Sequence, residues 1–280
     1  MRLEKPFRAD LHCHSTHSDG TLTPLELVEL AKSVGLQALS ITDHDAISSY
    51  SAAYSLSKDL GIYLIPGVEL STTHGKEQIH ILGYGFDPQG ETLMEFCKKC
   101  RQNRISRNRE IIELLRKKGF LIEESDIAPH FDEHAAYGRP HIATALLKKG
   151  YVKSVQEAFL RYIGEGRPCY VPGEKYSVEE GIEAIHKSQG LAVIAHPHLI
   201  ENKKTVKELL KLQFDGLEAY YSRFPEVIDD RWVKIALEHH LFTTGGSDFH
   251  GSVKPEVKLG SKYTPESVFW HLWNHFQKIK

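Results

Sequence analysis

Short apolar runs alternate with amphipathic stretches in the first third of the chain. The apolar runs have the length of buried strands, and the stretches between them have helical spacing. We predict strands at residues 8–13, 36–42, 62–70 and 79–86, and helices at residues 24–34 and 46–60. Thr23 followed by Pro24 is typical of a helix start. This part of the chain is therefore predicted to repeat a strand–helix unit.

A different pattern occupies residues 91–160, which are helical in spacing and rich in charge, with no strand pattern before Tyr170. The alternation then returns, with helices predicted at residues 178–188, 203–212 and 225–240, and strands at residues 191–195, 216–220 and 241–244. Such alternation predicts parallel strands. We expect a barrel-like α/β domain from residues 1–90 and 172–280, with residues 91–171 as an inserted helical subdomain. An open doubly wound sheet would show the same periodicity.

Composition and charge narrow the classes of partner. The formal net charge is -2, so no overall positive field attracts the protein to nucleic acid or membrane. The pair Cys97 and Cys100 lies in a polar helical stretch without a second Cys or His pair, which favours reduced thiols over a zinc or redox site. We find neither an apolar leader nor an apolar run long enough to cross a membrane, and therefore expect a cytoplasmic protein.

Histidine is over-represented, with 17 residues against 12 phenylalanines and 12 tyrosines. Many stand where an apolar run ends. His12 and His14 close the first predicted strand and point to the same face, because side chains alternate along a strand. Asp248 and His250 repeat this spacing near the end of the chain. Side chains that converge in this way suit a zinc, iron or manganese ion, although a single His-x-His on its own favours a purely structural role.

Three further clusters follow predicted strands. They are Thr42-Asp43-His44-Asp45, Pro66-Gly67-Val68-Glu69 with His80 beyond it, and His196-Pro197-His198. Buried polar groups are costly unless they are paired or bind metal. Asp45 fits a helix N-cap, whereas a cap does not explain His44. Since the carboxyl ends of parallel strands gather at one rim, we predict a metal centre there rather than a set of core histidines.

These motifs together resemble the PHP family, named for polymerase and histidinol phosphatase. The matching residues run in order along nearly the whole chain: His12-x-His14, Asp19-Gly20, Thr42-Asp43-His44-Asp45, Pro66-Gly67-Val68-Glu69, His80, His196-Pro197 and Ser247-Asp248-x-His250. The resemblance implies an α/β fold of the distorted (β/α)7 barrel type with an inserted helical subdomain. It also implies a phosphoesterase with two or three divalent metal ions, which would be Mn2+, Zn2+ or Fe2+.

Carried over by position, the resemblance implies three sets of metal ligands. One ion would be held by His12, His14, Glu69 and Asp248, a second by Asp19, His44 and His250, and a third by His80 and His196, with Glu69 bridging to the first. A metal-bound hydroxide would be the nucleophile that attacks phosphorus. Asp19 stands where many histidinol phosphatases have histidine, which disfavours a histidinol-phosphatase-like activity.

Within the family, the chain is similar to a stand-alone branch of small phosphoesterases. These hydrolyse nucleoside 3′,5′-bisphosphates, and some shorten RNA from its 5′ end. The helical insertion, with Gly138-Arg139-Pro140-His141 inside it and Tyr170-Val171-Pro172 at its end, fits that branch. The expected substrate is therefore a small nucleotide or a short oligonucleotide, with no membrane and no obligate protein partner.

Four residues are predicted to contact the substrate. Arg139 is the first choice for a second phosphate, because guanidinium binds phosphate through two parallel hydrogen bonds. The others are His141, Arg167 and Lys175, and ordinary surface charge explains the last two equally well. His198 is the candidate general acid for the leaving oxygen.

Two other classes of protein remain open. Amidohydrolases cleave C–N bonds with similar barrel metal centres, but they usually bridge their metals with a modified lysine, where this chain has Glu69. A nucleic-acid-binding module without catalysis could use the Arg- and Lys-rich insertion, but such a module would be expected to have lost some of its metal ligands.

Overall fold

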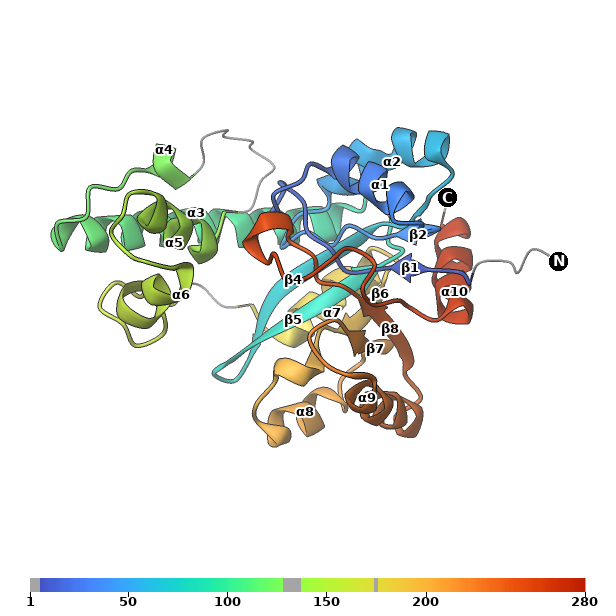
Figure 1. The fold of residues 1–280 in the computed structure, drawn as a ribbon. Helices are drawn as coiled ribbons and strands as arrows, with labels where there is room; N and C mark the ends of the chain where they lie inside the picture. The colour runs from blue at the N-terminus through green and yellow to red at the C-terminus, as the bar shows by residue number, and fades with distance from the viewer. Residues whose placement is uncertain (1–5, 128–136, 174–175, 280) are drawn as a thin grey trace.

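The computed structural model describes residues 6–127, 137–173 and 176–279. Its strands form two sheets (Figure 1). The smaller sheet has the order β1 (Ala9–Asp10), β2 (Ala38–Leu39) and β3 (Tyr63–Leu64), all parallel. The larger has the order β4 (Gly67–His74), β5 (Glu77–Tyr84), β6 (Leu191–Ile194), β7 (Gly216–Tyr221) and β8 (Phe242–Gly246). The fold is thus mixed α/β.

The expectation of parallel strands throughout is wrong at β5, which runs antiparallel to both β4 and β6. The turn at Gly75 and Lys76 joins β4 directly to β5, with His74 opposite Glu77. Only antiparallel strands can be connected so tightly, because parallel neighbours need a long crossover. Gly75 has a φ of 61°, a conformation that glycine adopts without strain.

Continuous strand pairing in the described residues does not close a barrel. Isolated bridges nevertheless join the two sheets at both sides, between Cys13 and Phe249 and between His44 and Glu69. A backbone hydrogen bond from Leu11 N to Gly245 O adds to the first junction. The first bridge joins the segments that follow β1 and β8, and the second joins the segment that follows β2 to β4.

Helices cover the sheets on two sides and follow local sequence signals. They are α1 (Pro24–Ser33), α2 (Ser48–Leu60), α7 (Val178–Lys187), α8 (Lys203–Leu209), α9 (Glu226–Glu238) and α10 (Glu266–Gln277), with short turns η2 (Pro197–Leu199) and η3 (Gly251–Val253). The predicted start of α1 is confirmed: Glu26 N donates to Thr23 Oγ1 at 3.2 Å, and Thr23 N donates to Glu26 Oε2 at 2.7 Å. This reciprocal cap satisfies two donors that a helix start leaves free.

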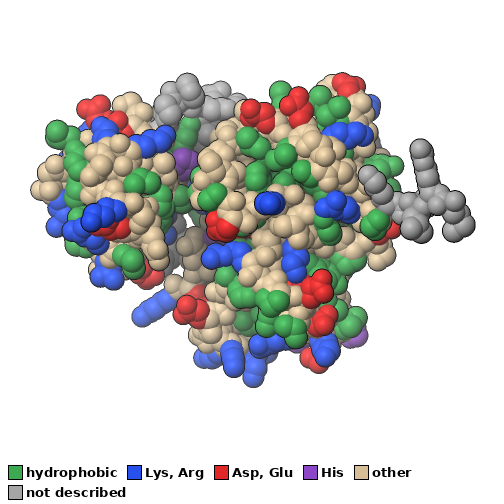
Figure 2. All heavy atoms as spheres, viewed as in Figure 1, with side chains coloured by type: hydrophobic (Ala, Val, Ile, Leu, Met, Phe, Trp, Pro, Cys, Tyr) green, Lys and Arg blue, Asp and Glu red, His purple; other side chains and the backbone are tan. Residues whose placement is uncertain are grey.

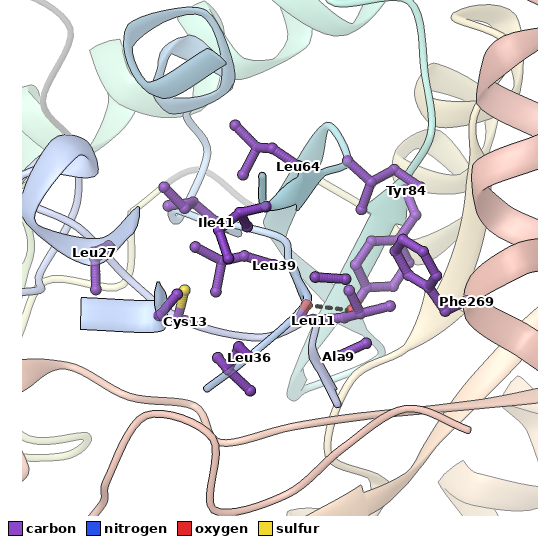
Figure 3. Packing of buried hydrophobic residues seen from close by; sticks show 14 of the residues in the cluster. Ala9, Leu11, Cys13, Leu27, Leu36, Leu39, Ile41, Leu64, Tyr84 and Phe269 are labelled. Carbon is purple, nitrogen blue, oxygen red and sulfur yellow. Dashed lines mark hydrogen bonds between the residues drawn. The ribbon is translucent and has the colours of Figure 1, made fainter. Parts of the chain in front are cut away.

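Strand β5 has a hydrophobic cluster on each face. Ile79 and Ile81 pack with residues of α7, α8 and α9, whereas Leu82 and Tyr84 pack with β1, β2, α1 and α10. Figure 3 shows the second cluster, in which the Tyr84 hydroxyl donates to Leu11 O at 2.8 Å. Because neighbouring side chains point to opposite faces, His80 lies on the face opposite Ile79 and Ile81.

The described helices between β5 and α7 form a lobe beside the sheets (Figure 1). It contains α3 (Glu91–Lys117), α4 (Glu124–Ile127), α5 (Arg139–Lys148), α6 (Val155–Ala158) and the π-helical turn η1 (Phe159–Ile163). The lobe has its own apolar cluster, which includes Ile111, Leu115 and Leu146. Among the described residues, no helix is both long and apolar enough to cross a membrane.

Candidate metal centre

The predicted ligands follow strand ends or lie on strands, and the structure brings them together. Glu69 lies on β4 between Val68 and Leu70, which face the α7–α9 cluster, so its side chain points to the opposite face. His80 on β5 faces the same way. His12 and His14 arrive after β1, His44 after β2, His196 after β6, and Asp248 and His250 after β8, while Asp19 lies in the loop before α1.

Glu69 is the carboxylate that the histidines share. Its Oε2 atom lies 3.4 Å from His12 Nε2, 3.2 Å from His14 Nε2 and 3.2 Å from His44 Nδ1. Its Oε1 atom lies 2.8 Å from His80 Nδ1 and 2.9 Å from His196 Nε2. Each oxygen therefore faces a different group of imidazoles, as a carboxylate that bridges two ions would.

Asp248 and Asp19 extend the cluster. Asp248 Oδ1 lies 3.5 Å from His12 Nε2 and 3.3 Å from His14 Nε2. Asp19 Oδ1 lies 3.3 Å from His250 Nε2 and 3.5 Å from His14 Nδ1. His14 thus contacts both carboxylates, whereas the sequence assigned it to the first ion alone.

Three groups of side chains offer converging ligand atoms. They are His14, Asp19, His44 and His250; His12, His14 and Glu69; and His44, Glu69 and His80. A tetrahedron with edges near 3.3 Å has its centre about 2.0 Å from each corner, which is a normal metal–ligand distance. The four distances that join His12 and His14 to Glu69 and Asp248, 3.2–3.5 Å, are close to this edge length, and His12, His14 and Glu69 form one of the three converging groups.

Unpaired nitrogen atoms give a second test of this fit. His12 Nε2, His14 Nε2 and His44 Nδ1 are buried and have no hydrogen-bond partner. Leaving such atoms unsatisfied destabilises the folded state, whereas a cation would satisfy all of them at once. The donor set of imidazoles and carboxylates suits Mn2+, Fe2+ or Zn2+.

Opposite charges shift the pKa values within the cluster. Burial alone would raise the pKa of Glu69, but the neighbouring histidines, His44 foremost, outweigh it and hold the pKa well below the ordinary value. Burial alone would lower the pKa of His14, but Asp248, Glu69 and Asp19 raise it to about 9. Glu69, Asp248 and Asp19 therefore remain charged although they are largely buried, because the pKa of each is held well below its ordinary value.

Sequence reasoning missed Glu218, which orients two of the predicted ligands. This residue lies on β7 and is fully buried. Its Oε1 atom lies 2.8 Å from His12 Nδ1, and its Oε2 atom accepts from His196 N at 2.8 Å. Since a carboxylate only accepts, His12 donates from Nδ1, which leaves Nε2 free for a metal. A lone acidic residue within the apolar run of β7 was the available signal.

Asp43 was noted in its cluster but given no role. The structure shows that it holds the loop after β1 in place. It accepts from Ser15 N at 2.8 Å, Ser15 Oγ at 2.6 Å and Ser18 Oγ at 2.5 Å, and also from Ser49 Oγ. These bonds account for a fully buried carboxylate that lies beside the ligands rather than among them.

Asp45 is not the predicted helix cap, because α2 begins at Ser48 and its N-cap is Ile47. The Asp45 side chain instead contacts Arg104 and the backbone of Ser71. Asp45 Oδ2 accepts from Arg104 Nε at 2.8 Å and Nη2 at 2.6 Å, and Oδ1 accepts from Ser71 N at 2.8 Å. The pair ties helix α3 to β4 beside the metal centre.

Two adjacent cavities lie between the sheets and the helical lobe, where Figure 2 shows a hollow. The smaller, about 150 Å³, touches Asp19, His44 and His80. The larger, about 330 Å³, extends along the β4–β5 hairpin. Both are lined by Gln78, Arg104, Arg107, Arg139 and Phe159.

The arginines between these cavities differ in their partners. Arg104 is paired with Asp45, whereas Arg107 has no ion pair among the described residues and its Nε atom is buried without a partner. Burial, followed by the charges of Arg104 and Arg139, lowers the pKa of Arg107 to about 10. Arg139 lies 5.5 Å from the ring centre of Tyr170 and 5.9 Å from that of Phe159. Among the described residues, Arg107 and Arg139 therefore line both cavities without forming an ion pair.

The other residues predicted to contact the substrate do not line either of these two cavities, as far as the structure describes them. His141 is partly buried, and its Nδ1 accepts from Gly138 N at 3.2 Å. Arg167 is exposed and lines neither of these two cavities. Lys175 lies outside the described residues.

His198, the predicted general acid, lies among aromatic side chains and not in the lining of either cavity. Its ring packs 5.1 Å from Phe224, 5.3 Å from Trp232 and 5.7 Å from Tyr221, measured between ring centres. Burial, followed by the charge of His196, lowers its pKa to about 4. A side chain enclosed by aromatic rings and absent from the lining of both cavities is a poor general acid, so we do not carry this role forward.

Comparison with known proteins gives consistent results. The PHP domain family model matches residues 10–248. The chain is 33% identical over 278 residues to the 5'-3' exoribonuclease Rnm of Escherichia coli, covering 96% of this chain and 94% of that protein. It is 33% identical over 255 residues to the 3',5'-nucleoside bisphosphate phosphatase of Chromobacterium violaceum, covering 86% of each.

Solved structures resemble this one over nearly their whole length. A protein of Bifidobacterium adolescentis described as a candidate metal-dependent phosphoesterase aligns with a TM-score of 0.87 at 30% identity, covering 97% of this chain and 98% of that one. A protein of Chromobacterium violaceum described as an amidohydrolase, with bound sulfate and no metal, aligns with a TM-score of 0.86 at 30% identity and 96% coverage of both.

Proposed function

The chain belongs to the PHP domain family of metal-dependent phosphoesterases, and we propose that its substrate is a nucleoside 3′,5′-bisphosphate or the 5′ end of a short RNA. One observation carries this choice of substrate. The small cavity is lined both by predicted metal ligands and by Arg107, whose buried Nε atom has no hydrogen-bond partner. Such a cavity can hold one phosphate at the metal centre and a second phosphate at the arginines.

We assign the metal ligands as the residues whose atoms converge around Glu69 and Asp19. They are His12, His14, Asp19, His44, Glu69, His80, His196, Asp248 and His250. Divalent ions bound there, Mn2+, Zn2+ or Fe2+, would activate water and neutralise charge on the phosphate. Glu69 and Asp248 contribute negative charge that offsets the cations, and Glu218 fixes the tautomer of His12.

The arginines supply selectivity. Arg107 and Arg139 can donate to a phosphate that is not cleaved, because neither forms an ion pair among the described residues, whereas Arg104 does. Arg104 is already paired with Asp45 and holds helix α3 in place. The rings of Phe159 and Tyr170 beside Arg139 can pack against the sugar or base.

We also infer that the two sheets are parts of one distorted barrel. The bridges from Cys13 to Phe249 and from His44 to Glu69 support this, since they connect the sheets at both sides of the metal centre. The helical lobe supplies the arginine side of the cavities, as expected of an insertion that forms part of the substrate site. A cytoplasmic location stays a prediction.

An activity screen tests the function. The purified protein would be assayed with Mn2+, Zn2+ or Fe2+ on a nucleoside 3′,5′-bisphosphate, a 5′-phosphorylated oligonucleotide, histidinol phosphate and a panel of amides. We expect hydrolysis of the first two and little of the others. Preferential amide hydrolysis, or nucleic-acid binding without turnover under every metal, would overturn the proposal.

A further inference from the structure

The two oxygens of Asp248 have different surroundings. Oδ1 faces His12 Nε2 at 3.5 Å and His14 Nε2 at 3.3 Å, within the predicted metal centre. Oδ2 accepts from the Tyr221 hydroxyl and from Lys254 Nζ, each at 2.7 Å. One oxygen thus points to the ligands, and the other is held by two donors.

Lys254 forms an ion pair with a predicted metal ligand. It follows η3 and reaches back to Asp248 from a side chain that is 29% exposed, whereas the Asp248 side chain is 7% exposed. Among the described residues, no other lysine or arginine forms an ion pair with a predicted ligand. The other carboxylates of the predicted metal centre, Glu69 and Asp19, contact histidines. The ion pair between Lys254 and Asp248 therefore needs its own explanation.

We propose that Lys254 is a positioning residue that makes Asp248 a one-oxygen ligand. A free carboxylate can bind one ion through both oxygens. A charge-assisted hydrogen bond from Lys254, together with that from Tyr221, occupies Oδ2 and leaves only Oδ1 for the metal. The ion then keeps a lower coordination number and a position open to water or substrate. This inference rests on the proposed metal centre.

A merely structural role is the competing explanation. In that case Lys254 fastens the loop after β8, and its loss lowers stability without changing how an ion is coordinated. Lys262 provides the matched control. It forms a similar pair with the buried Asp229, which is not a predicted ligand, and its side chain is 17% exposed.

The test uses Co2+, whose visible absorption bands weaken as its coordination number rises from four. Wild type, Lys254→Met, Lys254→Arg and Lys262→Met would be titrated with Co2+ to saturation and compared by absorption spectrum, affinity and melting temperature. We expect Lys254→Met to weaken the bands, because Oδ2 then becomes available to the ion and raises its coordination number. Lys254→Arg should restore the bands, and Lys262→Met should match wild type.

Contrary outcomes are distinct. An unchanged spectrum in Lys254→Met, or an equal change in Lys262→Met, would overturn the role of Lys254 alone. A wild-type protein that binds no Co2+ would overturn the metal centre itself. If Lys254→Met does not fold, Lys254→Ala replaces it, since alanine also removes the donor to Oδ2, and the same spectral criteria apply.

Discussion

At the scale of single residues, Glu69 has the largest role, because imidazoles from separate strands meet at its carboxylate. Glu69→Gln keeps the size of the side chain and removes the charge that balances the cations. We expect metal affinity to fall about 10- to 100-fold at more than one site, and turnover to fall with it. Elemental analysis after dialysis measures the loss.

Glu208→Gln is the control for Glu69. Glu208 contacts His74 at 3.2 Å, away from the predicted ligands. Normal occupancy and near-wild-type turnover in Glu69→Gln would show that the bridging role has been misassigned.

Arg139 is expected to select the substrate. Loss of one charge-assisted contact costs about 1.5–3 kcal/mol, or roughly 10- to 100-fold in specificity. Arg139→Ala should therefore lower kcat/KM for a nucleoside 3′,5′-bisphosphate far more than for an aryl phosphate. Since Arg139 also packs near Phe159 and Tyr170, a small loss of melting temperature should accompany it. Equal losses on both substrates would contradict the selective role.

Arg107 should separate stability from selectivity. Its Nε atom is buried without a partner, and burial and nearby positive charge lower its pKa. Arg107→Met should leave the free energy of unfolding unchanged or higher, yet lower kcat/KM for the bisphosphate about 10-fold. Urea unfolding and steady-state kinetics measure the two effects. Arg109→Ala, on the exposed face of the same helix, should change neither, and a stability loss in Arg107→Met would argue for a structural role.

At the scale of elements, the contact between α3 and β4 depends on one buried ion pair. The Asp45 side chain is 1% exposed and that of Arg104 is 15% exposed. Asp45→Asn should leave the guanidinium uncompensated and destabilise the fold by roughly 3 kcal/mol. Denaturant unfolding measures this cost.

The double variant Asp45→Asn/Arg104→Met completes that test. Removing both charges should recover much of the lost stability, because no unpaired charge then remains. If Asp45→Asn alone is as stable as wild type, the pair does not anchor α3.

Some elements could be predicted because their signals are local. The cap of α1 is contained in Thr23, Pro24 and Glu26, so its start was correct. The start of α2 was misplaced because Asp45 has a distant partner, 59 residues along the chain. The direction of β5 was missed because periodicity gives the faces of a strand, not the direction of its neighbour.

At the scale of the molecule, the convergence of the predicted ligands could be anticipated because most of them follow an apolar strand, and strand ends gather in space. Their supporting residues could not. Glu218 contacts His12 across 206 positions of sequence, and only the fold makes them neighbours. The unpaired state of Arg107 likewise depends on which carboxylate Arg104 already occupies.

Bound metal should stabilise the whole fold, because the proposed ligands come from both sheets. A ligand at about 100 times its Kd adds roughly 2.7 kcal/mol. Chelation should therefore lower the melting temperature by about 5 °C or more and abolish turnover, and added Mn2+ should restore at least the turnover. Differential scanning fluorimetry and kinetics check this. Full turnover in protein shown to be metal-free by elemental analysis would refute it.

The junction between β1 and β8 has a consequence for synthesis on the ribosome. Ser247 N donates to Asp10 Oδ1, a contact across 237 positions, and Asp248 meets His12 and His14 at the same place. A nascent chain therefore exposes the first two predicted metal-binding histidines long before their carboxylate partner has been translated. The proposed cation site can be complete only after β8 has emerged from the exit tunnel, so we expect metal loading to be a late step in the biogenesis of this enzyme.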